Sequence, residues 1–279
     1  MFLWPAFLDS TSRCSPTSWY YKSDQGSFVK KVALPFLDDI RPPVRKAAAQ
    51  SVVLLSAQSK SNGNTVGLTH NVAFSNKTMH QILNKLLSIA VSDPDEEVRE
   101  IMLGSLSRNF DSYLKNKSSM QCLILALNDS NDKVQRKAII LLKRLIFTNA
   151  SDVVPALQNS LYRILRIVNM KTYDNEKDVI QNLKLLKCFL NNAAFLLKNQ
   201  EDLIFRFLLS SLQHEKTIPT ISSELFSTLS CLVIVARKVT MKYFDPLMQV
   251  TLSSFTDLTF TAKRVEAIKC LTSIIRSTG

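Results

Sequence analysis

Apolar residues recur at helical spacing along most of the chain. Four segments place them mainly three, four and seven residues apart, which is the pattern of one face of an amphipathic helix. The four faces comprise Met79, Ile82, Leu83, Leu86 and Ala90; Met120, Leu123, Ile124 and Leu127; Val134, Ala138, Leu141 and Leu145; and Val154, Leu157, Leu161, Ile164, Leu165 and Val168. No run of four to eight residues alternates cleanly enough to predict a strand. The pattern predicts an all-α fold over residues 25–279.

Two segments depart from this helical pattern. Residues 1–24 mix Ser, Thr, Pro and Trp without a period, so we predict an irregular or poorly ordered N-terminal segment. Residues 57–76 are rich in Ser, Asn and Gly and lack an apolar stripe. We expect them to form a polar, exposed insertion between two helical hairpins.

Three turns between paired helices repeat one pattern. Their sequences are DDIRPPVRKAA at residues 38–48, SDPDEEVREIM at 92–102 and NDSNDKVQRKA at 128–138. In each turn an Asp is followed five residues later by Val, and the next position holds Arg, Arg and Gln respectively. The second and third turns lie 36 residues apart. A period of this length indicates helical hairpins that stack on one another to bury their apolar faces.

The polar residues of these turns are assigned structural roles. Asp, Asn, Ser and Pro stop the first helix of a pair, and Asp95 or the Ser130–Asn131 pair caps the N–H groups of the second. We expect the Asp of one turn and the Arg after Val to form a charge-assisted ladder from one repeat to the next. Arg45 and Arg99 are interpreted as ladder residues rather than ligand-binding residues, and Arg99 is expected to be exposed or half-exposed. The structural ladder and loop positions are Asp39, Arg45, Asp93, Arg99 and Asp129.

Composition excludes several classes of function. The formal net charge is +12, but the basic residues are spread along the chain without aromatic residues between them. This distribution favours a solvated basic surface over nucleic-acid binding. The five glycines have neither dinucleotide-fold nor P-loop spacing, the five cysteines include no CxxC pair, and the three histidines have no neighbours at metal-ligand spacing. We therefore expect reduced cysteines and no metal, cofactor or catalytic residue.

Membrane insertion is also disfavoured by the sequence. The longest uncharged apolar stretch, around residues 229–236, is far shorter than a membrane span. The opening MFLWPAFL has no preceding positive charge and is interrupted by Pro5, so it is not interpreted as a signal peptide. These features predict a soluble chain without a transmembrane segment.

The repeated turn resembles that of HEAT repeats, and the order of its loop residues resembles the HEAT region of the TOR (target of rapamycin) kinases. Over residues 93–129 the similarity is carried by Asp93, Pro94, Asp95, Phe110, Asp111, Leu127, Asn128 and Asp129. Residues 152–168 resemble the next helix of that family through Val154, Pro155, Leu157 and Leu161. Residues 257–279 resemble a later unit through Asp257, Ala262, Lys263, Arg264, Ala267, Ser277, Thr278 and Gly279. Gln135 departs from the pattern, because an Arg is usual there.

The resemblance implies an α-solenoid of stacked antiparallel hairpins of the HEAT/armadillo-like kind. It implies a scaffold segment of a TOR-family serine/threonine protein kinase, which provides a protein-binding surface for complex assembly in nutrient and growth signalling. The implied partners are the WD40-bearing adaptor subunit of a TOR complex and the adjoining HEAT repeats of the parent chain. The implied location is cytoplasmic, with peripheral association at the lysosomal or vacuolar membrane through the parent complex and some nuclear protein.

Catalysis is not expected of this chain. It contains neither a His-Arg-Asp nor an Asp-Phe-Gly triplet, so ATP and Mg²⁺ would belong to the kinase domain of the parent protein. The alternative function is a free-standing HEAT-repeat adaptor, such as a nuclear transport receptor or a phosphatase scaffold, whose basic surface would hold acidic cargo. A reading frame that continues past Gly279 into a kinase domain would distinguish the first function from the second.

Overall fold

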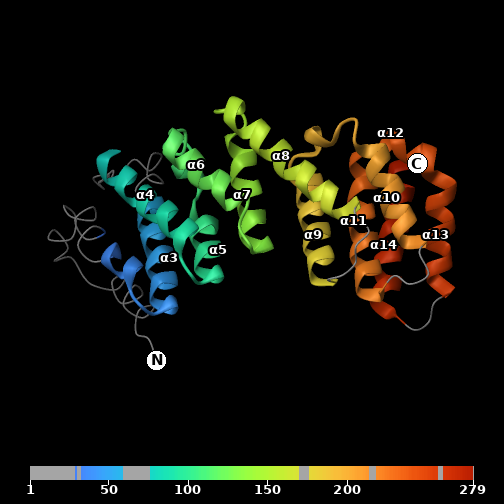
Figure 1. Ribbon diagram of the computed structural model, residues 1–279, viewed down its shortest axis with the longest axis horizontal. Coiled ribbons are helices and arrows are strands. Elements are labelled where there is room, and N and C mark those ends of the chain that lie inside the picture. The colour runs from blue at the N-terminus through green and yellow to red at the C-terminus, as the bar shows by residue number, and fades with distance from the viewer. Residues whose placement is uncertain are drawn as a thin grey trace, which may run out of the picture. The chain divides into compact units, whose positions relative to one another are not determined.

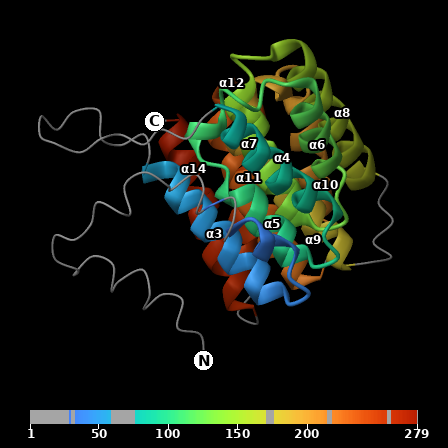
Figure 2. The same ribbon diagram turned by 90° about the vertical axis from the view of Figure 1, so that its left-hand side faces the viewer.

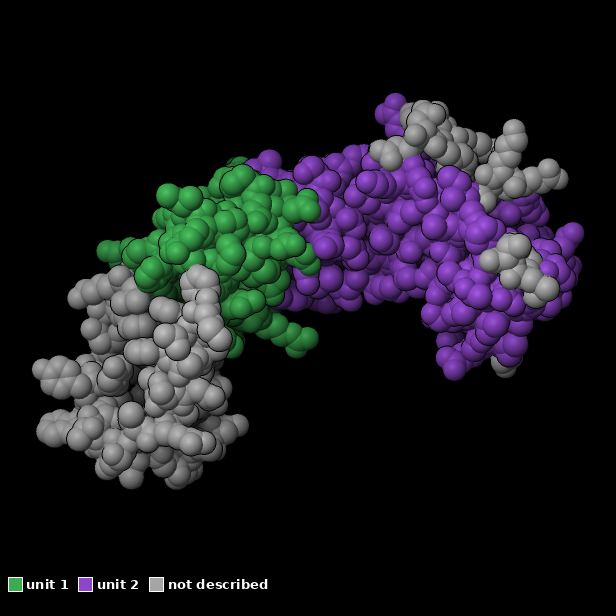
Figure 3. All heavy atoms as spheres, turned by 90° about the horizontal axis from the view of Figure 1, so that it is seen from below, with its two compact units in different colours: residues 1–122 green, residues 123–279 purple. Residues whose placement is uncertain are grey.

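A computed structural model describes Val29 and residues 33–58, 76–169, 176–213, 218–256 and 260–278. Within these ranges the chain forms helices and turns and contains no strand, which confirms the all-α prediction (Figure 1). The predicted irregular segment 1–24, most of the predicted insertion 57–76, Asp257 and Gly279 lie outside the described residues. The chain divides into two compact units, residues 1–122 and 123–279, a division that the sequence pattern did not predict (Figure 3).

The first unit is built from the earliest hairpins. Its elements are the 3₁₀ helix η3 (Pro35–Asp38), α3 (Pro42–Gln58), α4 (Asn76–Ser92), α5 (Glu96–Ser105), the 3₁₀ helix η4 (Arg108–Phe110) and the first half of α6 (Lys117–Ala126). Helix α5 packs against α4, its partner in the hairpin, and against α3, the second helix of the preceding pair. Successive second helices therefore lie next to each other in this unit, as stacked hairpins require.

The second unit repeats this arrangement over a longer stretch. Its elements are the second half of α6, α7 (Asp132–Leu145), α8 (Ala150–Asn169), α9 (Glu176–Asn192), η5 (Ala194–Leu197), α10 (Glu201–Gln213), α11 (Pro219–Val235), α12 (Arg237–Thr240), η6 (Met241–Tyr243), α13 (Phe244–Thr256) and α14 (Thr261–Thr278). Helices α9, α11 and α14 run side by side in one layer (Figures 1 and 2), and α7 packs on the other flank of α9. Helices α8, α10 and α13 pack as the hairpin partners of α9, α11 and α14. Each hairpin thus packs on its neighbours in sequence, which is an α-solenoid arrangement.

The predicted apolar faces form the core. Every residue of the 79–90 and 134–145 faces is buried, whereas Ile124 of the 120–127 face is half-buried. In α8 the buried face begins at Val153, which is 0% exposed, and not at the predicted Val154, which is half-buried. Val153 stands four residues before Leu157, and that spacing continues to Leu161, so only the first residue of the face lies one position earlier than predicted; the other five are buried as expected.

Candidate functional site: the turns and the exposed helix faces

The three repeated turns share one backbone structure, which explains the spacing of their residues. The Asp that stands five residues before Val in each turn accepts a 2.8 Å hydrogen bond from the backbone N–H two residues later, forming an Asx turn. The pairs are Asp39 with Arg41, Asp93 with Asp95, and Asp129 with Asn131. The residue after Val then donates from its side chain to the carbonyl oxygen of the same Asp. These pairs are Arg45 with Asp39, Arg99 with Asp93, and Gln135 with Asp129. Each turn is therefore closed by two contacts to one Asp.

Capping of the following helix differs between the turns. The Asp95 carboxylate accepts from the backbone N–H of Glu97 at 2.8 Å and of Val98 at 3.2 Å. The Asn131 side chain accepts from Lys133 N at 2.8 Å. Arg41 occupies this position in the first turn, and α3 starts there with two prolines, which have no N–H group to be capped. The Asp95 and Asn131 caps are those expected from the sequence.

The structure brings Arg45 and Asp93 together across two repeats. Arg45 Nε lies 2.7 Å from Asp93 Oδ2, and Arg45 Nη2 lies 2.8 Å from Asp93 Oδ1. The two side chains are 9% and 4% exposed respectively. Such a bidentate, charge-assisted pair is among the stronger polar contacts in proteins. Beside it, Lys46 Nζ lies 2.5 Å from Glu97 Oε2, a surface contact that the sequence analysis did not include.

Arg99 is buried, and the expectation that it is exposed or half-exposed is wrong. The residue is 9% exposed, because its side chain folds back over its own turn. Its Nη1 group donates to the carbonyl oxygens of Asp93 at 2.8 Å and Pro94 at 3.4 Å. A guanidinium that satisfies backbone carbonyls in this way is a structural group and is not presented to a ligand.

A residue that the sequence analysis missed completes the third turn. Arg163 of α8 donates to Asn128 Oδ1 at 2.7 Å and to the carbonyl oxygen of Leu127 at 3.0 Å. It also lies 3.5 Å from Gln135 Oε1. Arg163 stands 28 residues after Gln135 and belongs to no repeated motif, so spacing within the turns could not reveal it.

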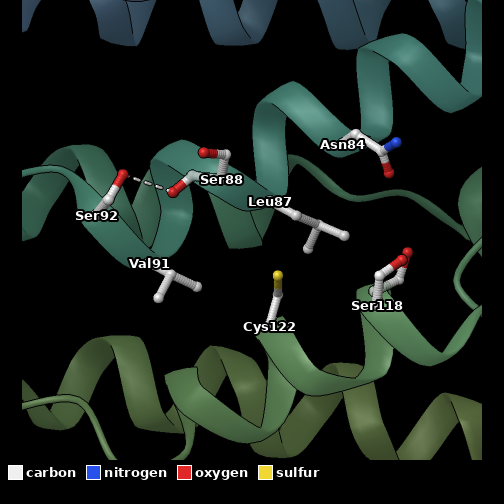
Figure 4. A pocket seen from close by; sticks show the side chains of 8 residues that line it. Asn84, Leu87, Ser88, Val91, Ser92, Ser118 and Cys122 are labelled. Atoms are coloured by element: carbon white, nitrogen blue, oxygen red, sulfur yellow. Dashed lines mark hydrogen bonds between the residues drawn. The ribbon is translucent and has the colours of Figure 1, made fainter.

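An open groove lies between α4 and α6 in the first unit (Figure 4). Its volume is about 390 Å³, and it is lined by Asn84, Leu87, Ser88, Val91, Ser92, Ser118, Ser119 and Cys122. Burial raises the pKa of the Cys122 thiol, which keeps it protonated and a weak nucleophile. The lining offers hydroxyl groups and apolar surface but no acid or base with a pKa near neutrality. This groove can bind, and it lacks the groups for acid–base chemistry.

A second groove lies among α9, α11 and α14 in the second unit. Its volume is about 480 Å³, and it is lined by Lys187, Ser223, Glu224, Ser227, Thr261, Ala262, Val265 and Glu266. Lys187 donates to the Ser227 hydroxyl within it. Nearby, burial raises the pKa of the Cys270 thiol to about 12. The lining of this groove contains no cysteine and no histidine.

Metal-binding clusters and membrane-spanning helices are both absent from the residues that the structure describes, apart from one bent helix pair. Those residues contain no cluster of three or more His, Cys, Asp or Glu side chains that could hold a metal ion. No individual helix there has the length and apolarity needed to cross a membrane; one bent pair, Pro219–Val235 with Arg237–Thr256, meets the criteria by length and composition alone.

The last helix of the second unit leaves an apolar stripe exposed. Ile268 and Ile275 are 53% and 60% exposed and lie on one face of α14, whereas Val265, 48% exposed, lines the groove shared with α9 and α11. The opposite face, with Ala267, Cys270, Ser273 and Ile274, is buried. In contrast, α9 packs between α7 and α11 and has no large apolar side chain among its exposed residues. The stripe on α14 is the side that a further helix of the layer would cover.

Sequence comparison relates the chain to a set of protein kinases. No protein-family model matches it. It is 27% identical over 254 residues to the serine/threonine-protein kinase tor1 of Schizosaccharomyces pombe, covering 91% of this chain and 10% of that protein. It is 28% identical over 253 residues to TOR2 of Saccharomyces cerevisiae and 26% identical over 260 residues to TOR of Arabidopsis thaliana, covering 90% of this chain and 10% of each relative. The predicted resemblance to the TOR kinases is thus confirmed.

The chain spans about a tenth of the length of these relatives. Its described residues are helical, whereas a protein kinase carries its phosphate-positioning Lys on a strand. The chain is not itself a kinase. Among solved structures, an engineered protein aligns with 89% of the chain at 14% identity and a TM-score of 0.44, and importin β aligns with 91% at 13% identity and a TM-score of 0.40.

Proposed function

We propose that this chain is a scaffold segment of a TOR-family serine/threonine protein kinase and provides a protein-binding surface for complex assembly in nutrient and growth signalling. The observation that carries the proposal is the similarity to three TOR kinases over nine tenths of the chain. The stacked hairpins support it, because their polar groups are used to close turns and their long faces remain available for contact.

Adjoining HEAT repeats of the parent kinase are the first proposed partner. The exposed stripe of Ile268 and Ile275 supports this, since equivalent flanks of α9 and α11 are covered by the next helix of the layer. Full burial of such a side chain from full exposure is worth about 1.5–3 kcal/mol. Because both side chains are already about half buried, a covering helix would gain about half of that from each. The parent chain can supply that helix without a separate association step.

The WD40-bearing adaptor subunit of a TOR complex is the second proposed partner. ATP and Mg²⁺ would act in the kinase domain of the parent protein and not in this segment. The proposed location is the cytoplasm, with peripheral association at the lysosomal or vacuolar membrane through the complex and a nuclear fraction. These assignments rest on the family resemblance, and a direct experiment can test them.

The size of the natural protein tests the proposal most directly. An antibody raised against this chain should detect a polypeptide about ten times its length, since the chain spans a tenth of its relatives. The same antibody should precipitate a WD40-repeat protein, identified by mass spectrometry, together with that polypeptide. A product of 31.5 kDa without such a companion would contradict the proposal and favour the free-standing adaptor.

The stripe on α14 offers a test within the parent protein. The double variant Ile268→Glu/Ile275→Glu should make the parent chain more sensitive to limited proteolysis near this helix, because a covering helix would be displaced. Leu125→Glu changes a residue of α6 that is 57% exposed and serves as the matched control. Equal cleavage of both variants would show that no repeat covers α14.

A further inference from the structure

Helices α7 and α9 together present a basic face in the second unit. They pack against each other, and α8 packs against both, so α8 covers one side of the pair. On the remaining surface, α7 contributes Lys133, Arg136, Ile140 and Lys143 at positions that repeat every three to four residues, and α9 contributes Lys184 and Lys187. These six residues are called the α7–α9 basic face.

The two helices approach closely enough for this face to act as one surface. Cys188 Sγ of α9 lies 4.0 Å from the carbonyl oxygen of Arg136 in α7, and Lys143 Nζ lies 3.5 Å from Asn192 Oδ1. The α7 cations therefore stand next to the second half of α9, where Lys184 and Lys187 lie. On the far side of Lys187, Glu224 and Glu266 line the neighbouring groove, so the basic face ends there.

Four of the five cations on this face form no ion pair with a carboxylate among the described residues. Lys143 contacts the Asn192 amide and Lys187 the Ser227 hydroxyl, while Lys133 and Lys184 have no side-chain ion pair. Arg136 alone pairs with an acid, Asp132, at 2.8 Å. Elsewhere among the described residues of this unit, exposed Lys242 and Lys269 each have an acidic partner, whereas exposed Lys198 and Lys238 form no ion pair, so the face is distinguished by the clustering of its cations.

Helix stabilisation accounts for only one of these lysines. Lys143 lies in the last turn of α7, where a cation interacts favourably with the helix dipole. Lys133 lies in the first turn of the same helix, where a cation is disfavoured, and Lys184 lies in the middle of α9. Their clustering on one surface is therefore not explained by local helix energetics.

Apolar side chains are interspersed with the cations. Ile140 is 40% exposed and lies between Arg136 and Lys143 on the face, and Phe147, just beyond the end of α7, is 98% exposed. Single-stranded nucleic acid is bound by aromatic side chains that lie between the cations, whereas the side chain between Arg136 and Lys143 is the aliphatic Ile140, and Phe147 lies past the last cation of α7. Its complement is a segment in which carboxylates alternate with large apolar residues.

We propose that the α7–α9 basic face binds an acidic, amphipathic segment of a protein partner. The inference rests on the proposed scaffold function only in taking the ligand to be a protein. Carboxylates of the segment contact the four lysines that form no ion pair, and an apolar side chain covers Ile140. Because the lysines are exposed or half-buried, their contribution is mainly long-range attraction and falls as salt screens it.

The test is a binding titration with the whole chain and a labelled synthetic peptide in which Glu alternates with Leu and Phe. The matched probe is the same peptide with every Glu replaced by Gln. We expect the Glu peptide to bind at least about tenfold more tightly at low salt, and the difference to shrink as NaCl rises from about 0.05 to about 0.5 M. Equal affinities of the two peptides, or no binding of either, would overturn the inference.

Variants locate the binding on the chain. Lys143→Glu/Lys184→Glu should weaken binding of the Glu peptide about tenfold or more, because two attractive contacts become repulsive. Lys198→Glu/Lys238→Glu is the matched control, because it makes the same two charge reversals at exposed positions of the second unit outside α7 and α9. It should change the affinity for the Glu peptide less than about twofold. Equal weakening by both variants would mean that only net charge matters and would overturn the assignment.

Folding controls and competing ligands complete the test. Circular dichroism checks folding, and if the Glu variant is unfolded, Lys143→Gln/Lys184→Gln takes its place with a smaller expected loss. Ile140→Ser should weaken binding of the Glu peptide without altering how that binding depends on salt. Tighter binding of oligodeoxythymidine or phosphatidylserine vesicles, lost in the same lysine variant, would assign the face to nucleic acid or membrane instead. A chain that captures the WD40 adaptor but not the peptide would overturn this inference alone.

Discussion

The turn at Asp39 and the turn at Asp129 have the same local structure but different connections to the rest of their units. Both form an Asx turn and are closed by a side chain six residues later, Arg45 or Gln135. The Arg45 side chain also donates to the buried Asp93 carboxylate of the next repeat. Among the described residues, the Gln135 amide donates only to the carbonyl oxygen of Asp129 in its own turn. Closing the turn requires only an N–H donor, and linking repeats requires the second, bidentate edge of a guanidinium.

The third turn has no Arg at the position of Arg45, and an Arg from α8 contacts it instead. Arg163 reaches it from α8 and donates to a neutral amide and to a backbone carbonyl. Arg45 and Asp93 thus form a buried ion pair. The contacts of Arg163 at the third turn form a half-buried network in which only the guanidinium is charged. Removing one member of a buried pair leaves an uncompensated charge, so the two turns should respond very differently to substitution.

The largest expected effect is that of Arg45→Ala. The Asp93 carboxylate, 4% exposed, would remain buried without its partner, and breaking such a pair costs about 3–5 kcal/mol. The free energy of unfolding, measured by urea titration, gives the loss. Arg45→Gln imitates Gln135 and should recover part of it through the bond to the Asp39 carbonyl. If Arg45→Ala lowers the free energy of unfolding by only about 1 kcal/mol, the pair behaves as a surface ion pair.

Core truncation should affect both units alike. Leu86→Ala in α4 and Leu141→Ala in α7 each remove a side chain that is at most 3% exposed. Each should cost about 2–5 kcal/mol through lost burial and the cavity left behind. Urea midpoints of the two variants provide the measurement. A large difference between them would show that the units differ in their cores as well as in their turns.

A smaller effect is expected at the third turn. Arg163→Ala removes two hydrogen bonds from a half-buried network and should cost about 1–2 kcal/mol, while Gln135→Ala should cost about 1 kcal/mol. In the double variant the losses should not add, because the two side chains contact each other at 3.5 Å. Strict additivity in this double-mutant cycle would show that Arg163 and Gln135 act independently.

Features that repeat along the sequence could be predicted, and contacts outside the repeated motif could not. Helical spacing predicted most of the buried faces, and the repeated Asp and Val positions predicted the turns and a ladder between repeats, of which the Arg45–Asp93 pair is one contact. Arg163 was missed because it comes from the next hairpin and carries no repeated motif. The burial of Arg99 was missed because the sequence does not show that a long side chain folds back over its own turn.

The candidate surfaces were predictable to a lesser degree. The sequence gives the number of basic residues but not which of them lack an acidic partner, since that depends on the packing of α7 against α9. The groove between α4 and α6 likewise depends on side chains from two helices. Such surfaces arise from the stacking of repeats, and the pattern within one repeat does not determine them.

The smallest expected effect concerns the charge of one helix cap. Burial raises the pKa of the Asp95 carboxyl, but hydrogen bonds from the backbone N–H of Val98 and Glu97 and attraction to Lys46 outweigh it, so the pKa lies below its ordinary value. The unfolded chain then binds the proton more readily than the folded chain. The resulting stability is present above about pH 4 and is lost as pH falls through the lowered pKa. Asn131, the equivalent cap in the second unit, does not titrate.

Asp95→Asn should therefore convert the first cap into a copy of the second. At pH 7 the variant should be less stable than the natural chain by less than about 1 kcal/mol, because Asn and Asp are similar caps and only the charge is lost. Below about pH 4 the difference should shrink toward zero, since Asp95 is then protonated and its charge no longer contributes. Urea unfolding of both proteins between neutral and acidic pH measures this difference. A gap that stays constant, or widens in acid, would show that the Asp95 charge does not stabilise the turn and that the two caps differ for another reason.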